Sequence, residues 1–317
     1  MNTTEKVIVE QFPYWEAALG SNAAEGRADL LVFVGCGTSY NLALSLAAYA
    51  NMAGRKAIAA PGFEWQNRPA GLWADWKNTH VVALSRSGES TETVAAAKAS
   101  RAAGAFVTAI TAEPDSALAM NCDQLVTAKT HPDEGIVMSV SACLMVLLGL
   151  QMIGQAVPAS AVTSARRLME ELDAGLRKTA LDRSYFVFLG GGPLFGIALE
   201  GALKLMEMSQ IVTQAFHPLE YRHGPISLVD ERTAAIVLYS SDQREAEVKL
   251  VGELREKGAF VIGVGGPGDL ELAVDVDLSL AGLVVLPALQ MLGERAAQAR
   301  GIDTVSPRHL TKVVSLA

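Results

Sequence analysis

The sequence predicts an α/β protein with two tandem domains, each a parallel sheet flanked by helices in the flavodoxin-like or Rossmann-like manner. Three observations predict this class. Short apolar strands end at glycine-rich or serine-rich turns, helical segments follow those turns, and the whole arrangement occurs twice within 317 residues. Strands that alternate with helices are typical of a parallel sheet covered on both faces. A chain of this length also holds two domains of ordinary size.

The first half of the chain contains the elements of one such sheet. In order, we predict an amphipathic helix over 4–19, strands over 30–34, 80–84, 106–110 and 124–127, and helices over 40–53 and 92–103. The apolar run 138–157 approaches the length of a membrane span. Its Ser and Gln residues and its lack of flanking Lys or Arg indicate a buried core helix instead.

The second half repeats the first in register. Gly35 and Gly190 end equivalent strands 155 residues apart, and Ser85 and Ser240 end the next pair at the same offset. The tetrapeptide Gly-Ala-Phe-Val also recurs at an offset of 154. Matches in register on matching elements indicate an internal duplication.

We therefore predict two domains, over residues 1–158 and 159–317, joined by a charged helix over 162–178. The two copies differ at their strand ends. The first keeps hydroxyl residues there, whereas the second has Gly-Gly-Pro at one strand end and Asp242 at the other, where an acid would repel a phosphate. The first copy should therefore bind an anion in the crevice beyond the carboxyl ends of its strands.

The composition excludes several classes of function. The net charge of −8 leaves no basic footprint for nucleic acid. The three cysteines are odd in number and lack metal-type spacing, which fits a reducing cytoplasm. The first residues contain no apolar core of the signal-peptide kind. We expect a cytoplasmic protein with no cofactor, no metal and no membrane partner.

Two turns could hold a phosphate. Gly35-Cys36-Gly37 is followed by Thr38 and Ser39, and the loop 85–91 is rich in hydroxyl residues directly before a helix. Backbone amides at helix N-termini bind phosphate without help from Lys or Arg. The first turn is not a dinucleotide fingerprint, because a third glycine would have to replace Tyr40. A tight structural turn and a solvated serine-rich loop are the alternatives.

A helical segment that begins near Ala198 carries a charged stripe. Glu200, Lys204 and Glu207 are spaced four and three residues apart, so they share one face of an otherwise apolar helix. His223 follows in a polar turn. A carboxylate, an ammonium and an imidazole near one cleft could carry out acid–base chemistry. An intrahelical ion pair with a surface histidine is the alternative.

These motifs resemble the sugar isomerase (SIS) family. Residues 35–40 and 85–90 are similar to its two phosphate loops. Three further segments resemble the isomerase domains of the glucosamine-6-phosphate synthases, also called glutamine:fructose-6-phosphate amidotransferases: 198–207, 222–225 and 301–312. The resemblance covers about residues 5–317 in order. Residue 1 falls just before the isomerase region, so no glutaminase domain and no complete synthase reaction are expected. Val140-Ser141 also stands where the family often has Thr-Lys.

The resemblance implies which residues bind and which react. The substrate and its 6-phosphate would be held by Gly37, Thr38, Ser39, Ser85, Arg86, Ser87, Ser90, Val137 and Ser139. His223 would move the proton that opens the sugar ring, and Glu207 would shuttle a proton between C1 and C2. Lys204 would keep Glu207 ionised, and Lys312 would form an imine with the keto sugar. The histidine would come from the neighbouring subunit of a homodimer.

The sequence therefore predicts an enzyme that acts on a hexose 6-phosphate, most closely a glucosamine-6-phosphate deaminase that gives fructose 6-phosphate and ammonia. Two other reactions use similar groups: a deglycase acting on fructosyl-amine or glucosyl-amine 6-phosphates, and a ketose/aldose isomerase of the tagatose-6-phosphate type. A sugar-phosphate sensor without catalysis is an alternative of another class.

Overall fold

The computed structural model describes residues 1–21, 28–69 and 75–314, and it divides into two compact units. The first-sheet unit contains residues 10–158 and 309–317, and the second-sheet unit contains residues 1–9 and 159–308. The first nine residues therefore belong with the second sheet and the last nine with the first. The predicted division at 158/159 did not include this exchange of terminal segments.

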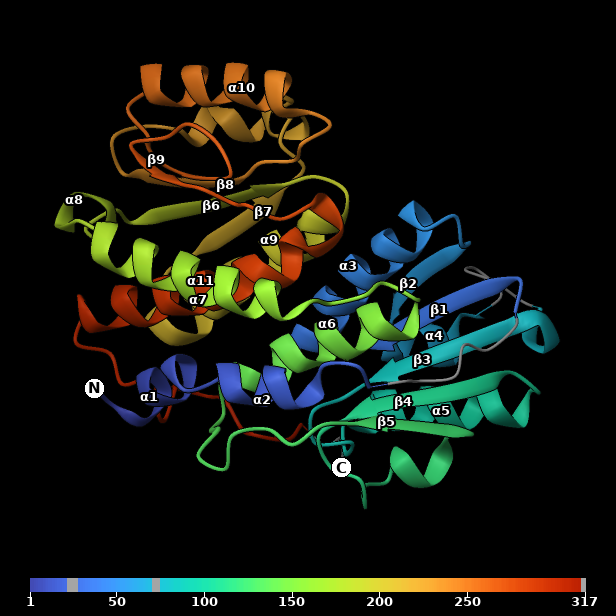
Figure 1. The fold of residues 1–317 in the computed structure, drawn as a ribbon. Coiled ribbons are helices and arrows are strands. Elements are labelled where there is room, and N and C mark those ends of the chain that lie inside the picture. The colour runs from blue at the N-terminus through green and yellow to red at the C-terminus, as the bar shows by residue number, and fades with distance from the viewer. Residues whose placement is uncertain (22–27, 70–74, 315–317) are drawn as a thin grey trace. The chain divides into compact units, whose positions relative to one another are not determined.

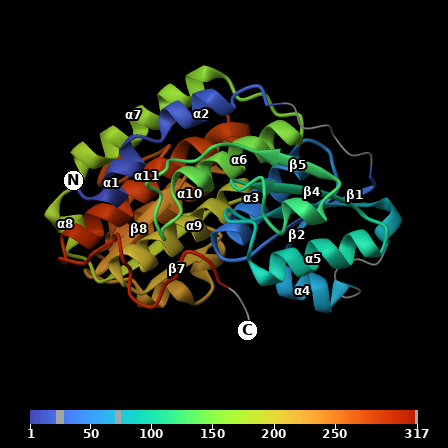
Figure 2. The same ribbon diagram turned by 90° about the horizontal axis from the view of Figure 1, so that it is seen from below.

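The first sheet has five parallel strands in the order β2-β1-β3-β4-β5. These strands are β1 (Leu30–Gly35), β2 (Ala57–Pro61), β3 (Thr79–Leu84), β4 (Phe106–Thr111) and β5 (Gln124–Thr127). Every residue of β1 and β3 is buried. Continuous apolar strands of this kind are typical of a parallel sheet covered on both faces, and helices cover both faces here (Figures 1 and 2).

Each face of the first sheet has its own set of helices. On one face lie α2 (Phe12–Ala18), α3 (Thr38–Met52) and α6 (Val140–Met152), and on the other lie α4 (Gly62–Asn67) and α5 (Thr91–Ala102). Trp65 of α4 is fully buried, and its indole N–H donates to Ser100 Oγ of α5 at 2.9 Å. The largest side chain of that layer therefore also satisfies its polar atom.

The second sheet repeats the first, with the strand order β7-β6-β8-β9-β10 and all strands parallel. Its strands are β6 (Tyr185–Gly190), β7 (Thr213–Phe216), β8 (Thr233–Leu238), β9 (Phe260–Val264) and β10 (Leu270–Leu272). Reading both sheets from the strand that comes second in each unit gives the same order, 2-1-3-4-5. The predicted duplicated α/β fold is confirmed.

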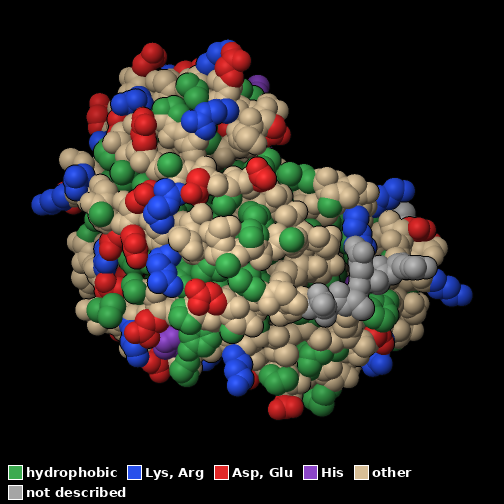
Figure 3. All heavy atoms as spheres, in the orientation of Figure 1, with side chains coloured by type: hydrophobic (Ala, Val, Ile, Leu, Met, Phe, Trp, Pro, Cys, Tyr) green, Lys and Arg blue, Asp and Glu red, His purple; other side chains and the backbone are tan. Residues whose placement is uncertain are grey.

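One face of the second sheet carries α7 (Ala159–Gly175), α9 (Pro193–Ser209) and α11 (Leu278–Gln298), and the other carries α10 (Arg244–Glu256) (Figure 1). A short helix, α8 (Lys178–Leu181), precedes β6. Two single turns, η4 (Glu220–Arg222) and η5 (Pro225–Leu228), follow β7. On the surface drawn in Figure 3, Lys and Arg side chains are interspersed with Asp and Glu rather than gathered in one patch.

Helices α9 and α11 pack closely because each has a glycine at the contact. A Cβ atom on Gly201 would lie 2.8 Å from Leu289 Cδ1, and one on Gly293 would lie 2.9 Å from Met208 Sδ. Among the described residues, α11 is the one helix long and apolar enough to cross a membrane, and 94% of its apolar window is buried. It is a core helix of this unit, although the sequence patterns did not predict it.

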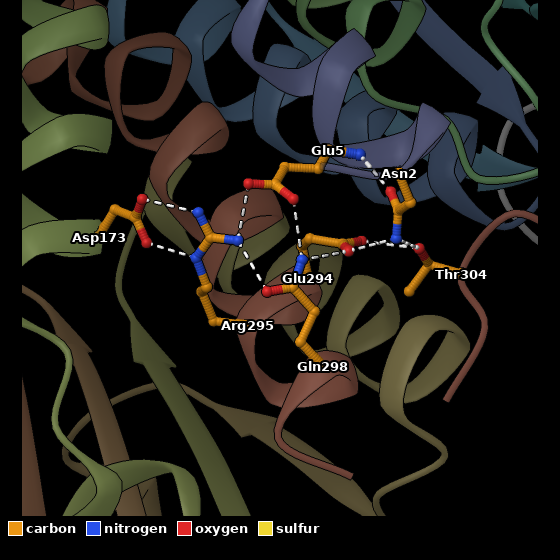
Figure 4. Close-up of polar contacts among 7 residues, drawn as sticks. All are labelled: Asn2, Glu5, Asp173, Glu294, Arg295, Gln298 and Thr304. Atoms are coloured by element: carbon orange, nitrogen blue, oxygen red, sulfur yellow. Dashed lines mark hydrogen bonds and ion pairs between the residues drawn. The ribbon is translucent and has the colours of Figure 1, made fainter. Parts of the chain in front are cut away.

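A polar network ties the N-terminal segment to α11 (Figure 4). Glu294, which is fully buried, accepts hydrogen bonds from Asn2 Nδ2 at 2.7 Å, Gln298 Nε2 at 2.9 Å and Thr304 Oγ1 at 2.7 Å. The neighbouring Arg295 donates to Asp173 of α7 and to Glu5. Hydrogen bonds from this guanidinium to Asp173, and then to Glu5, raise the pKa of Arg295 above its ordinary value. The network thus joins segments 1–9, α7, α11 and the stretch after α11.

The prediction of one helix over 4–19 is wrong. The structure has α1 (Thr3–Val9) and α2, separated at Glu10 and Gln11. Pro13 lies in the first turn of α2, where its missing N–H costs no helical hydrogen bond. The amphipathic pattern therefore continues through two helices that belong to different units.

His80 is a buried histidine on β3 with 1% of its surface exposed. Its Nε2 lies 2.7 Å from Thr108 Oγ1. Its ring packs edge-on against the Phe106 ring, with the two ring centroids 5.0 Å apart. Burial lowers its pKa to about 4; the nearby charge of Arg55 adds to this shift and that of Asp123 opposes it. The folded protein therefore holds His80 neutral at a pH where the unfolded chain is already protonated.

We predict that His80 makes the protein sensitive to mild acid. Its folded pKa is below its unfolded pKa of 6.5, so stability is full above pH 6.5 and is lost as the pH falls toward 4. Urea unfolding at pH 7.5 and 4.5 should show that the wild type loses roughly 2–3 kcal/mol more than His80→Gln over this range. Equal losses in the two proteins would contradict this account of His80.

Candidate functional site

The carboxyl ends of β1 and β3 form a switch point in the first sheet. These strands are neighbours, yet β1 continues into α3 on one face and β3 continues into α5 on the other. The connections diverge at this point, and in open α/β sheets such a divergence is where ligands bind. Both helices begin at this edge, so the positive ends of two helix dipoles meet there. This geometry suits an anion.

The turn from β1 into α3 requires glycine at two positions. A Cβ atom on Gly35 would lie 2.6 Å from the carbonyl carbon of Ser39, which is too close for any other residue. Gly37 has φ of +54°, in the region where side chains are disfavoured. Thr38 and Ser39 then open α3 and are buried at the switch point.

The loop from β3 into α5 folds around its own hydroxyl groups. Ser85 Oγ accepts the Gly88 N–H at 3.1 Å and donates to Ser90 Oγ at 3.4 Å. Ser87 Oγ accepts the Glu89 N–H at 3.2 Å, and Ser90 is the residue before the first turn of α5. The three predicted serines therefore gather at one helix N-terminus, as the sequence pattern indicated.

Arg86 lies in the same loop, but its guanidinium contacts backbone carbonyls. One terminal nitrogen donates to the Gly135 carbonyl at 2.8 Å, and the other donates to the Lys312 carbonyl at 3.0 Å. The side-chain ammonium of Lys312 donates to the Glu134 carbonyl at 3.0 Å. Arg86 and Lys312, which were assigned to different tasks from the sequence, are thus direct neighbours within the first-sheet unit.

Glu134 is a functional candidate that sequence reasoning missed. It is 3% exposed, and its Oε1 accepts the N–H groups of Ser139 at 2.7 Å and Ser141 at 3.0 Å. The carboxylate thus accepts hydrogen bonds from amides at the N-terminus of α6, and its negative charge interacts favourably with the positive end of that helix dipole. The capping-box motif would not reveal this contact, because its acid follows the cap rather than preceding it by five residues. Val137 and Ser139, both predicted sugar contacts, are buried in the same segment.

The predicted charged stripe lies on one face of α9, where Glu200 and Lys204 are buried. Lys204 is 1% exposed and contacts both neighbouring carboxylates, at 3.6 Å for Glu200 Oε1 and more closely for Glu207 Oε2. The Glu207 side chain is 20% exposed, whereas that of Glu200 is 1% exposed. One ammonium between two carboxylates leaves excess negative charge, and Glu207 is the member that reaches solvent.

His223 lies in the same unit as Glu207, at the end of η4, and is exposed. Its backbone N–H donates to the Glu220 carbonyl at 3.0 Å, and among the described residues its ring makes no hydrogen bond. Glu207, Lys204 and His223 belong to the second-sheet unit, while the phosphate turns and Lys312 belong to the first-sheet unit.

The second sheet repeats the turn geometry but not the chemistry. Gly192 has φ of +54°, the same as Gly37, and a Cβ on Gly190 would lie 2.4 Å from the Leu194 carbonyl oxygen. At the end of β8, however, the Glu247 carboxylate accepts the Ser240 N–H at 2.9 Å and the Ser240 hydroxyl at 3.0 Å. Burial raises the pKa of Glu247, and the Ser240 hydrogen bonds oppose that rise. In the second copy, an internal carboxylate thus takes the hydrogen-bond donors at this strand end.

Two doubly wound sheets of identical order, with hydroxyl-rich turns at the switch point of the first, define a protein of the tandem α/β class. A family model described as the SIS domain matches residues 27–153 and 182–280. The chain belongs to the SIS domain family.

Known relatives agree with this membership. Glutamine–fructose-6-phosphate aminotransferase of Symbiobacterium thermophilum is 30% identical over 94% of this chain and 54% of its own length, and that of Pyrobaculum aerophilum is 31% identical over 89% and 51%. The chain therefore spans about half the length of the curated relatives it matches.

Two solved structures are similar to this fold over nearly the whole chain. The crystal structure of glucosamine-6-phosphate deaminase from Thermotoga maritima is 32% identical, covers 99% of this chain and 100% of its own, and has a TM-score of 0.88. Tagatose-6-phosphate ketose/aldose isomerase from Escherichia coli shares the fold, with a TM-score of 0.80 at 22% identity over 95% and 93% of the two chains.

We predict that Ser87→Ala weakens binding of a hexose 6-phosphate without unfolding the loop. Each hydrogen bond to a charged group is worth roughly 1.5–3 kcal/mol, so the dissociation constant should rise about tenfold or more. Calorimetric titration with glucose 6-phosphate measures this directly. Ser241→Ala, at the corresponding exposed turn of the second sheet, is the matched control and should bind as the wild type does. Equal affinity of the wild type and both variants would show that Ser87 does not contact the phosphate.

Proposed function

We propose that this protein is a glucosamine-6-phosphate deaminase, which converts glucosamine 6-phosphate and water into fructose 6-phosphate and ammonia. The main support is the 32% identity to the deaminase of Thermotoga maritima along essentially the full length of both chains. The buried Lys204 with its two carboxylates gives this assignment a chemical basis, because a carboxylate that reaches solvent beside a buried ammonium is suited to moving protons.

The substrate phosphate would bind at the switch point of the first sheet. Ser85, Ser87 and Ser90 would donate hydroxyl hydrogen bonds, and the first turns of α3 and α5 would add amide groups and dipole. A phosphate dianion needs several donors and a favourable local potential, and this edge of the sheet supplies both without a lysine.

The proton transfers would fall to His223 and Glu207. His223 would move a proton between the anomeric hydroxyl and the ring oxygen, which opens the pyranose to the aldehyde. Glu207 would then take the proton from C2 and return it to C1, which turns the amino aldose into a ketose imine. A single carboxylate can do both steps because C1 and C2 are adjacent.

Lys312 would release the ammonia. Its neutral amine would add to C2 of the imine, and a proton would pass from the added Lys312 nitrogen to the original nitrogen. The bond from C2 to the original nitrogen would then break, so that ammonia leaves and Lys312 remains bound to C2 as an imine. Water would then add to C2, and Lys312 would depart as the free amine to leave the ketone. Each bond formed at C2 is balanced by one that is broken, and no oxidant or reductant enters.

An assay of ammonia release decides among the reactions open to this site. We expect release from glucosamine 6-phosphate with formation of fructose 6-phosphate. Release of an amine from fructoselysine 6-phosphate alone would make the protein a deglycase, and conversion of tagatose 6-phosphate without amine loss would make it an isomerase. Binding of all the sugars with no turnover would make it a sensor. Galactosamine 6-phosphate as a further substrate tests the C4 epimer.

We predict that Glu207→Gln abolishes proton transfer while the protein still folds. The change keeps the shape of the side chain, and Lys204 retains Glu200 as a partner. Loss of a base should lower kcat roughly 10²–10⁴-fold, with sugar-phosphate binding unchanged. Deuterium exchange at C1 of fructose 6-phosphate, measured by NMR in D₂O, should disappear as well.

The matched control is Glu171→Gln on α7, which breaks an exposed ion pair with Arg167 that spans the same kind of helical spacing. An exposed pair contributes at most about 1 kcal/mol, so this variant should keep full kcat. If Glu207→Gln also keeps full kcat and deuterium exchange, the stripe of α9 is a structural ion pair.

We predict that the active sites are shared between two subunits. Glu207→Gln and His223→Ala should each be inactive alone. A mixture that exchanges subunits should form dimers with one site carrying both intact residues, and equal mixing should restore roughly a quarter of the wild-type activity. Subunit exchange is followed independently by mass spectrometry with one partner isotopically labelled. Background activity despite complete exchange would mean that each site is built from one chain.

A further inference from the structure

The loop around Arg86 meets the C-terminal segment through the backbone of Lys312. Arg86 is 7% exposed, and its two terminal nitrogens donate to two carbonyls that lie on different segments, Gly135 at 2.8 Å and Lys312 at 3.0 Å. These acceptors are 49 and 226 residues away along the chain. A planar guanidinium can serve two such acceptors at once, whereas an ammonium cannot hold both in a fixed geometry.

Both the backbone carbonyl and the side-chain ammonium of Lys312 make hydrogen bonds in this part of the first-sheet unit. Arg86 binds its carbonyl, and its side-chain ammonium donates to the Glu134 carbonyl at 3.0 Å. Lys312 is nevertheless an exposed residue. Both contacts are partly buried, but their donors differ: the backbone contact uses the buried Arg86 side chain, while the ammonium contact uses the exposed Lys312 side chain, which can exchange its acceptor for another.

The segment that receives these contacts is itself rigidly held. Glu134 is buried, and its carboxylate accepts hydrogen bonds from Ser139, Ser141 and, at 2.5 Å, from Thr130 Oγ1. These bonds fix the Glu134–Gly135 peptide against the N-terminus of α6. Arg86 therefore joins the C-terminal segment to a part of the unit that is itself held by several hydrogen bonds.

We propose that Arg86 is a positioning residue that fixes the backbone at Lys312, so that the Lys312 side chain can leave the Glu134 carbonyl and reach the substrate while its main chain stays in place. This proposal rests on the role of Lys312 given under the proposed function. It replaces the reading of Arg86 as a phosphate contact, because both terminal nitrogens of its guanidinium already donate to carbonyl groups.

Trypsin cleavage after Lys312 tests the contact itself, without any assay of activity. The bond that trypsin cuts contains the carbonyl that Arg86 binds, so Arg86→Gln should speed the loss of residues 313–317 about tenfold or more, as followed by intact mass. Arg86→Lys should give an intermediate rate, since it can keep one of the two hydrogen bonds. The matched control is Arg101→Gln, which breaks an exposed pair with Asp123 in the same unit and should cleave as the wild type does. Thermal unfolding of each variant establishes that it is folded.

Kinetics test the consequence for the reaction. Arg86→Gln should lower kcat about tenfold or more, with the affinity for glucose 6-phosphate within about twofold of the wild type. In a Lys312→Ala background the same change should have no further effect on kcat, because a residue that acts only through Lys312 has nothing left to position.

The outcomes separate this proposal from the proposed function. Unchanged cleavage in both Arg86 variants, or a weaker affinity for glucose 6-phosphate with kcat preserved, would overturn it. Additive losses in the double variant would overturn it as well. Faster cleavage in a protein that turns over none of the sugars would support the anchoring of Lys312 by Arg86 and refute the deaminase assignment.

Discussion

One steric constraint underlies the arrangement of both units: there is no room for a side chain where β1 and β6 end. Gly35 and Gly190 approach the backbone of the following helix so closely that a single added carbon would displace it. This close approach lets each helix begin directly at the edge of its sheet. The amides and dipole of α3 therefore face the carboxyl ends of the strands, and the neighbouring strand brings the serine loop beside them. Without that turn, the serine loop would have the N-terminus of α5 beside it but not that of α3.

The duplicated fold could be predicted because its signals can be read along the chain: apolar strands, glycine turns and offsets of 154 or 155 residues between matching elements. Elements with weak local signals were missed. β2 (Ala57–Pro61) is rich in alanine and ends in proline, which are residues that disfavour strands, yet it pairs fully with β1. The grouping of Ser85, Ser87 and Ser90 at one turn could be predicted because it depends only on their spacing along the chain, and their role in binding phosphate stays a prediction. Arg86 and Glu134 could not be understood from sequence, because their partners are set by the tertiary fold.

The two copies differ in whether the strand end contains an internal carboxylate. In the first, Ser85 accepts the Gly88 N–H and donates to Ser90, so both of these contacts stay within the loop. In the second, Glu247 reaches back from α10 and takes both donors of Ser240. Asp242, which the sequence suggested as the repelling group, is exposed at the turn, and the buried carboxylate is the one that occupies the donors. Under the proposed function, ligand binding falls to the first sheet, while the second presents the charged helix α9.

The exchange of terminal segments between the units has a consequence for dissecting this protein. A fragment that starts at residue 159 contains α11 with its buried Glu294, but it lacks Asn2 and Glu5, which bond to Glu294 and Arg295 respectively. Each buried group deprived of its partner costs about 1–3 kcal/mol, a large part of the stability of a domain of this size. A fragment ending at 158 likewise lacks the segment that Arg86 holds. Cutting the chain at its apparent midpoint thus yields two incomplete fragments. A rearranged fragment in which residues 159–308 are followed by residues 1–9 would keep the second sheet together with its own N-terminal helix.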